Sequence, residues 1–199
     1  MAVFLSILIH ELGHALVMRA HGYRPWVTLY GMGGLASYNP GDAHGSRGPT
    51  ALGQILISMA GPMAGFLLAA LIVAPIVALD HVDEFFPYGA GWPWIKPYLI
   101  GSKQFTDFLM DMLYINIFWG LVNLLPVYPL DGGHVSREIF LVFNSRDGIR
   151  RSLILSIVTS VVLVALALNW DEWYIAVLFG YMGYSGYQTL QAYTHGRRW

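Results

Sequence analysis

The chain is organised as long apolar runs separated by short polar stretches. Five of these runs are at least about 18 residues long: 1–18, about 51–79, about 104–128, 152–169 and about 172–193. A helix needs about 20 mostly apolar residues to cross the hydrocarbon core of a bilayer. The pattern therefore predicts an all-α polytopic membrane protein with about five transmembrane helices.

Residues 24–40 break this pattern, because they are too polar and too rich in glycine for a spanning helix. The runs WVTLY and LASY favour β-strands, and the GMGG between them is typical of a turn. We predict a small membrane-associated β-hairpin after the first helix. An exposed hairpin edge can accept an extended peptide, although an ordinary surface hairpin explains the same residues.

If the hairpin binds substrate, either strand could present the edge. The candidate substrate-binding residues are Val27, Thr28, Leu29 and Tyr30 on the first strand and Leu35, Ala36, Ser37 and Tyr38 on the second.

The charges between the apolar runs alternate in sign. Arginines follow the first and third runs and close the chain, whereas Asp and Glu follow the second and fourth runs. Arginine marks the cytoplasmic side of a membrane protein. With an odd number of spans, most of the arginine-containing segments lie on the cytoplasmic side and most of the acidic segments lie outside. Lys96 and Lys103 are exceptions, because they would lie outside. We predict a multi-pass protein of the cell membrane with its N-terminus outside and its C-terminus in the cytoplasm.

Composition supports a membrane protein and removes several classes of function. The chain is 56% hydrophobic and 12% charged, about half the charged fraction of an ordinary soluble domain. Its net charge of -1 argues against a nucleic-acid partner. The sequence has no cysteine, so a metal ion here must be bound by His and carboxylate side chains.

The most informative polar residues lie inside the first apolar run. His10, Glu11 and His14 form the pattern His-Glu-x-x-His, which is costly to bury in an apolar helix. On a helix the two imidazoles lie one turn apart on one face and can bind a single zinc ion. The glutamate can then take a proton from the attacking water. The alternative is a helix whose polar residues are satisfied by packing partners.

A catalytic zinc ion usually takes three protein ligands and keeps one position open. The candidates for the third ligand are Asp131, His134, Glu138, Asp42 and His44. Asp131 is the best placed, because the predicted topology brings the end of the third helix to the depth of the two histidines. Prolines break the helix just before Asp131, and Gly132 and Gly133 allow unusual backbone angles after it. An Asp that merely caps a helix also fits this position.

Together, the two motifs resemble the site-2 protease family of intramembrane zinc metalloproteases. The family combines His-Glu-x-x-His in one apolar helix with Asn-x-x-Pro-x-x-Pro-Leu-Asp-Gly-Gly in a later one, here at 10–14 and 123–133. A hairpin between its first core helices matches 24–40, and its Gly-Pro segment matches Gly61-Pro62. The chain departs from the family at Gly65, where a polar residue is common.

The resemblance implies a role for each motif residue. His10, His14 and Asp131 would bind one zinc ion per chain, and Glu11 would be the catalytic base. Asn123 would hold the substrate backbone or the developing oxyanion. A buried Asn that bonds a neighbouring helix is the alternative reading of Asn123.

The same features predict the domain organisation and the partners. We expect a three-helix catalytic core over 1–135, then a cytoplasmic connection and two C-terminal transmembrane helices over 136–199. The resemblance implies a minimal family member without a PDZ or CBS domain, acting on transmembrane proteins in a lipid bilayer. Small residues in 180–188 favour close helix packing, within the chain or in a homo-oligomer.

Two other functions fit some of these residues. A membrane transporter of divalent metal ions also places ligands in apolar helices, but it needs a second cluster across the bilayer. The best candidate for that cluster is His81 with Asp80 and Asp83. A catalytically silent relative could act as a scaffold. The intact His-Glu-x-x-His and Leu-Asp-Gly motifs favour an active endopeptidase that cleaves membrane-embedded or juxtamembrane segments.

Overall fold

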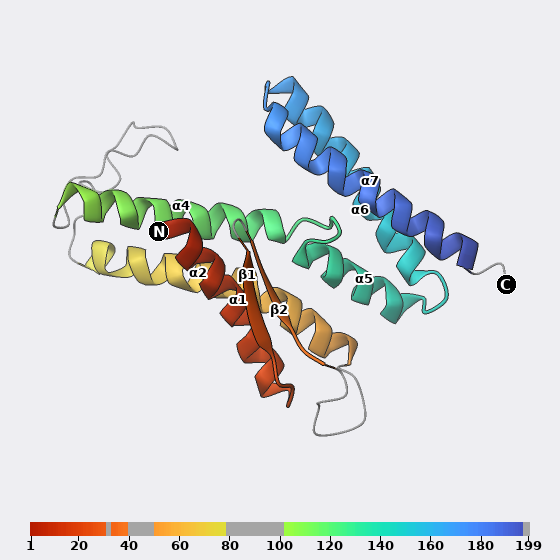
Figure 1. Ribbon diagram of the computed structural model, residues 1–199, viewed down its shortest axis with the longest axis horizontal. Coiled ribbons are helices and arrows are strands. Elements are labelled where there is room, and N and C mark those ends of the chain that lie inside the picture. The colour runs from red at the N-terminus through yellow and green to blue at the C-terminus, as the bar shows by residue number, and fades with distance from the viewer. Residues whose placement is uncertain (31–32, 40–49, 79–101, 197–199) are drawn as a thin grey trace.

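The computed structural model describes residues 1–30, 33–39, 50–78 and 102–196, which form six helices and a two-stranded sheet (Figure 1). The elements are α1 (Ala2–Ala20), β1 (Trp26–Tyr30), β2 (Gly33–Ser37), α2 (Ala51–Ala78), α4 (Lys103–Asn123), α5 (Asp131–Phe143), α6 (Gly148–Asn169) and α7 (Trp173–Gly196). The predicted helical fold class and the hairpin after the first helix are confirmed.

Four of the described helices are long and apolar enough to cross a membrane: α1, α2 over Ala51–Pro75, α4 and α6. Only 28–39% of the residues in their apolar windows are buried inside the protein. So much outward-facing apolar surface is unfavourable in water and suits a bilayer. The chain is therefore a multi-pass membrane protein. α7 is 24 residues long but is not among these four helices, and its crossing of the membrane stays a prediction.

Two local predictions differ from the structure. The third apolar run ends as α4 at Asn123, short of the predicted 128, and Pro126 and Pro129 follow, lacking the N–H that a continuing helix would donate. Asp131–Phe143, which includes the start of the predicted connection, forms the helix α5. α2 contains Pro62 and Pro75 and continues past both to Ala78. Residues 79–101, between α2 and α4, lie outside the described residues.

The helices form two groups joined by α5. α1, α2 and α4 pack together, while α6 and α7 lie side by side, and α5 contacts both α2 and α6 (Figure 1). Small residues bring the second pair close: a Cβ on Gly183 would lie 3.0 Å from the Cβ of Ser160. The small residues of 180–188 therefore pack α7 on α6, while association between copies stays a prediction.

An apolar cluster fixes the hairpin beside α1 and α2. Just after α1, Gly22 has a φ of 85°, which suits glycine, and the N–H of Tyr23 donates back to the Met18 carbonyl. Tyr23 packs with Met18 and Ile57, and its ring lies 4.4 Å from that of Tyr38. β1 and β2 pair antiparallel, and β2 makes the more extensive contact with α1.

Candidate metal centre

The three named residues of the His-Glu-x-x-His motif lie on the inward side of α1. His10, Glu11 and His14 are buried, with 6–7% of their surface exposed. Between the two histidines, a Cβ on Gly13 would lie 2.4 Å from the carbonyl oxygen of Ala60. The glycine therefore lets α1 approach α2 closely and brings both imidazoles against that helix.

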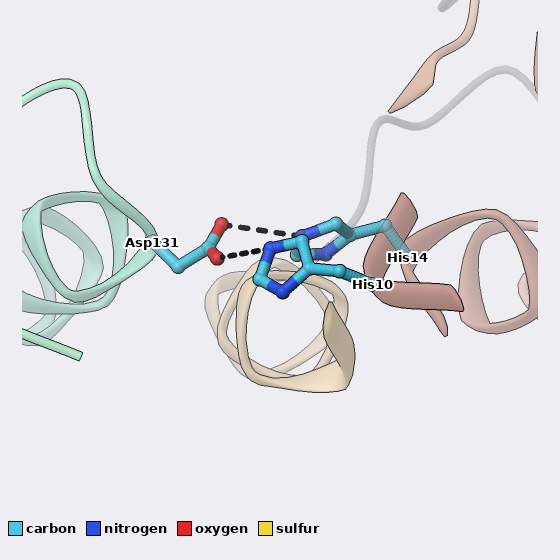
Figure 2. A group of neighbouring side chains, drawn as sticks. All are labelled: His10, His14 and Asp131. Atoms are coloured by element: carbon cyan, nitrogen blue, oxygen red, sulfur yellow. Dashed lines mark hydrogen bonds and ion pairs between the residues drawn. The ribbon is translucent and has the colours of Figure 1, made fainter. Parts of the chain in front are cut away.

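Asp131, the first residue of α5, meets the two histidines (Figure 2). Its Oδ2 lies 3.1 Å from His10 Nε2 and its Oδ1 lies 3.4 Å from His14 Nε2. The two Nε2 atoms are 3.2 Å apart. A tetrahedral zinc ion with ligand bonds of about 2.0–2.1 Å holds its ligands about 3.3 Å apart. Each imidazole nitrogen faces its own oxygen of the Asp131 carboxylate, and all three separations are close to the edge of such a tetrahedron. One ligand atom from each of the three residues lies within 4.8 Å of the others, so this donor set fits a metal ion.

Gly61 of α2 forms a wall of this cluster. A Cβ at position 61 would lie 2.2 Å from His14 Nε2 and 2.7 Å from His10 Nε2. Any side chain there would occupy the space in which the two nitrogens converge. The glycine therefore keeps this space open beside the metal-binding atoms of both histidines.

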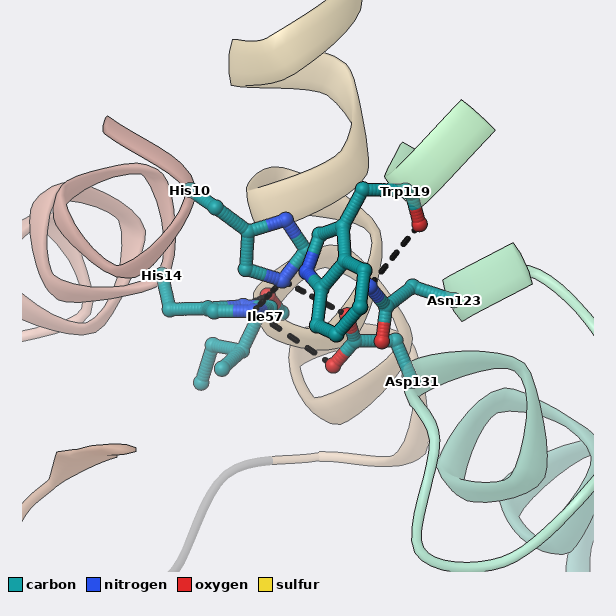
Figure 3. Close-up of polar contacts among 6 residues, drawn as sticks. All are labelled: His10, His14, Ile57, Trp119, Asn123 and Asp131. Carbon is teal, nitrogen blue, oxygen red and sulfur yellow. Dashed lines mark hydrogen bonds and ion pairs between the residues drawn. The ribbon is translucent and has the colours of Figure 1, made fainter. Parts of the chain in front are cut away.

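His14 is oriented by the backbone of α2 (Figure 3). Its Nδ1 lies 2.7 Å from the carbonyl oxygen of Ile57. Because a carbonyl oxygen can only accept, Nδ1 must be the donor. A neutral His14 then presents its unprotonated Nε2 to the cluster. Metal-binding histidines commonly donate from the other ring nitrogen in this way, which fixes the ring and its tautomer.

The Asp131 carboxyl is ionised in this setting. It lies outside the four candidate spans, although it is largely buried. Burial raises the pKa of this carboxyl, but the imidazoles of His10 and His14 lower it by more, so the net pKa lies below its ordinary value. The carboxylate is the form that binds metal ions.

The two glycines after Asp131 serve close packing. A Cβ on Gly132 would lie 2.2 Å from the carbonyl oxygen of Leu124, and one on Gly133 would lie 2.7 Å from that of Val127. The prediction that they provide unusual backbone angles was wrong, because both lie within α5 and neither has a positive φ. They let the start of α5 lie directly on the preceding loop, which fixes the position of Asp131.

The cluster lines a cavity of about 270 Å³. Glu11 lines it as well, and its side chain runs against β2, since a Cβ on Gly34 would lie 2.4 Å from Glu11 Cγ. Of the candidate substrate-binding residues, those in the cavity wall are Leu35, Ala36 and Tyr38, while Val27, Thr28, Leu29 and Ser37 do not line it, and the Tyr30 side chain lies outside the described part. β2 is therefore the strand beside the metal cluster.

Asn123, the last residue of α4, also lines this cavity (Figure 3). It is 7% exposed, and its Nδ2 donates to the Trp119 carbonyl at 2.9 Å. This bond stays within α4, unlike the bond to a neighbouring helix that was the alternative reading. It uses one of the two protons on the amide nitrogen.

The remaining candidates for the third ligand do not join the cluster. His134 lines the cavity but does not belong to the cluster of His10, His14 and Asp131. The Glu138 carboxylate lies 3.9 Å from the Arg137 guanidinium. Asp42 and His44 lie outside the described residues, as does the cluster at 80–83 considered for a transporter. Within the described ranges, His10, His14 and Asp131 are the one group of three potential metal ligands.

At Gly65, where the family commonly has a polar side chain, a polar side chain from another helix lies nearby. A Cβ at position 65 would lie 3.2 Å from the Oδ1 of Asn116. The Nδ2 of Asn116 donates to the Ser6 hydroxyl at 2.9 Å and to the Met112 carbonyl at 2.7 Å. α4 therefore supplies a buried amide beside the position where the family commonly carries a polar side chain on the second helix.

A family model named Peptidase family M50 matches residues 1–88 and 95–168, which include both motifs. The chain belongs to peptidase family M50. The family expected from the sequence, that of the site-2 proteases, is thereby confirmed.

Relatives with related sequences are consistent with this assignment. Zinc metalloprotease MJ0392 of Methanocaldococcus jannaschii is 26% identical over 139 residues, covering 69% of this chain and 32% of that protein. Stage IV sporulation protein FB of Bacillus subtilis is 28% identical over 173 residues, covering 85% and 49%. The chain thus spans about a third to a half of the length of the curated relatives it matches.

A solved structure shows the same fold. The site-2 protease from Methanocaldococcus jannaschii matches with a TM-score of 0.60 and 19% identity, over 95% of this chain and 76% of that chain.

Proposed function

We propose that this M50 chain is an intramembrane zinc metalloendopeptidase that cleaves transmembrane or juxtamembrane segments of membrane proteins. The observation that carries the proposal is the buried group His10, His14 and Asp131, whose ligand atoms lie within 4.8 Å of one another. Glu11 lines the same cavity. Relatives named zinc metalloproteases support zinc as the metal.

The chemistry follows from the residues of this cavity. His10, His14 and Asp131 would hold one zinc ion, which when bound polarises the scissile carbonyl and lowers the pKa of the attacking water. Glu11 takes the proton from that water and delivers it to the leaving amine. The burial of these side chains limits the access of bulk water and strengthens their electrostatic effect on the peptide.

The orientation in the membrane belongs to the same proposal. The arginines after the first and third runs favour a cytoplasmic location for those segments. The N-terminus would then lie outside and the C-terminus in the cytoplasm of a cell membrane. His10 and His14 would lie in the cytoplasmic half of α1, from which water would reach the cavity.

A comparison of membrane-protein fragments in cells tests the function. Cells expressing the wild-type chain are compared with cells expressing Glu11→Gln, and fragment ends are mapped by mass spectrometry. We expect fragments with ends in or beside transmembrane segments in the wild-type cells alone. Identical fragment sets in the two cultures would contradict the proposed activity and would leave transport or a scaffold role as the better reading.

The substrate must unwind locally, because the peptide bonds of a helix are shielded by their own hydrogen bonding. We propose that β2 binds the unwound stretch as an added strand, since β2 lines the cavity and packs beside Glu11. This choice favours Leu35–Tyr38 over Val27–Tyr30. It also places the bound backbone close to the catalytic base.

Disulfide trapping distinguishes the two strands, because the chain has no cysteine of its own. Leu35→Cys and Thr28→Cys are a matched pair, since the two residues lie opposite each other in the hairpin. In a Glu11→Gln background, a substrate with one cysteine near its cleavage site should form a disulfide with Leu35→Cys and not with Thr28→Cys. The bond requires Cβ atoms about 3.5–4.5 Å apart. Trapping by Thr28→Cys alone would assign binding to β1.

We expect Asn123→Ala to slow cleavage while the chain stays folded. If the amide stabilises the oxyanion, kcat falls by about 10²–10³-fold; if it holds the substrate backbone, KM rises instead. Asn116→Ala is the control, because Asn116 is a buried amide on the same helix outside the cavity. It should lower thermal stability without changing kcat or KM of the folded protein. Unchanged kinetics of Asn123→Ala would remove Asn123 from the site.

A further inference from the structure

A serine of α6 bonds the loop that leads to Asp131. The Ser156 hydroxyl accepts a hydrogen bond from the backbone N–H of Tyr128 at 2.8 Å. Ser156 is 1% exposed, so water does not compete for this bond. Tyr128 precedes Asp131 by three residues. A hydroxyl of the α6–α7 pair therefore contacts the loop that carries Asp131, the proposed third metal ligand.

The loop transmits the position of Tyr128 to Asp131. Val127 is fully buried, and its carbonyl accepts from the N–H of Leu130 at 2.8 Å. The carbonyl of Leu130 in turn accepts from the N–H of Gly133 at 2.9 Å. These two hydrogen bonds restrict the backbone between Tyr128 and the first turn of α5. The Asp131 carboxylate, held 3.1 and 3.4 Å from the histidine nitrogens, would follow a shift of the turn.

α7 supports Ser156 from its other side. A Cβ on Gly186 of α7 would lie 3.7 Å from the Ser156 hydroxyl oxygen. Ser152 and Ser160 lie one turn before and after Ser156, and both are buried, with 5% and 1% of their surface exposed. Ser152 donates to the Ile149 carbonyl of its own helix, and the Ser160 hydroxyl has no hydrogen-bond partner among the described residues. Of the three serines, Ser156 alone is hydrogen-bonded to the Asp131 loop.

We propose that Ser156 is a positioning residue for Asp131, so that the pair α6 and α7 contributes to the geometry of the metal centre. The inference rests on the proposed function, in which Asp131 binds zinc. Without the hydroxyl, the Tyr128 N–H loses its partner, and the turn relaxes away from α6. The carboxylate is then held less firmly against the imidazoles. Partners outside the ligand shell typically contribute 10–100-fold to metal affinity, and Ser156 acts through the backbone, at the lower end.

The three serines provide the test. The full-length chain is purified as wild type, Ser156→Ala, Ser152→Ala, Ser160→Ala and Ser156→Thr. Zn²⁺ affinity is measured by competition with a chelator, and the visible spectrum of the Co²⁺-loaded protein reports the ligand geometry. We expect Ser156→Ala to bind Zn²⁺ about tenfold more weakly with an altered Co²⁺ spectrum. Ser152→Ala and Ser160→Ala should match the wild type, and Ser156→Thr, which keeps the hydroxyl, should restore it.

Two results would overturn this role for Ser156. Wild-type affinity and spectrum in Ser156→Ala would show that the bond to Tyr128 does not position Asp131. An equal loss in all three alanine variants would assign the effect to general packing of α6. Failure of the proposed metal site is read separately, because the wild-type chain itself would then bind neither Zn²⁺ nor Co²⁺ at His10, His14 and Asp131.

Discussion

Glu11→Gln should all but abolish cleavage while leaving the metal centre intact. The amide preserves the size of the side chain and its packing against Gly34, but it cannot take a proton from water. General acid–base catalysis by a positioned side chain contributes about 10²–10⁴-fold, so the cleavage rate should fall by that factor. The metal content should not change, because Glu11 is not one of the three grouped ligands.

The measurement is the cleavage rate of a transmembrane substrate in liposomes, with metal content determined on the same preparation. Glu138→Gln is the control, because Glu138 lies beside Arg137 and outside the metal cluster. It should cleave at the wild-type rate. Normal cleavage by Glu11→Gln would show that another group acts as the base.

Gly61→Ala should remove the metal from the protein without unfolding it. The new Cβ would lie 2.2 Å from His14 Nε2 and 2.7 Å from His10 Nε2, which is closer than a Cβ approaches a non-bonded atom in proteins. Both imidazoles must then rotate away, and the ligand separations of about 3.3 Å that zinc requires are lost. Because alanine is a better helix former than glycine, α2 itself should remain intact.

Metal content, cleavage rate and helical circular dichroism should be measured together for this variant. We expect metal content and cleavage near background, with unchanged helicity. Gly180→Ala is the control, because the nearest atom to a Cβ at that position lies 3.9 Å away. It should bind metal and cleave as the wild type does. A fully metal-loaded Gly61→Ala variant would mean that the ion does not lie between His10 and His14.

The elements predicted well from the sequence are those whose signal is local. Long apolar runs predict α1, α2, α4 and α6 because length and hydropathy suffice. α5 was missed as a helix because its 13 residues are too few to span a bilayer and follow a loop with two prolines. The hairpin was predicted from β-prone residues around a glycine-rich turn, but the strand that lines the cavity depends on packing against α1.

In the candidate site, too, the residues with a local sequence signal could be predicted, and those that depend on packing could not. His10, Glu11 and His14 are fixed by spacing on one helix, so their shared location could be predicted. The family resemblance singled out Gly61, but its role and that of Gly34 could not be predicted, because both glycines leave space for side chains from another element. The link between Ser156 and Tyr128 joins residues 28 positions apart and has no local signature in the sequence. Such contacts become visible once the helices are packed.

Stepwise restoration of zinc to the metal-free protein tests the central claim most directly. The purified chain is stripped with a chelator, placed in liposomes with a transmembrane substrate identified by the fragment comparison, and titrated with Zn²⁺. Cleavage should rise with zinc up to about one ion per chain, and Asp131→Ala should neither retain zinc at this site nor cleave. Full cleavage by the metal-free chain, or zinc binding and cleavage unchanged in Asp131→Ala, would contradict the account.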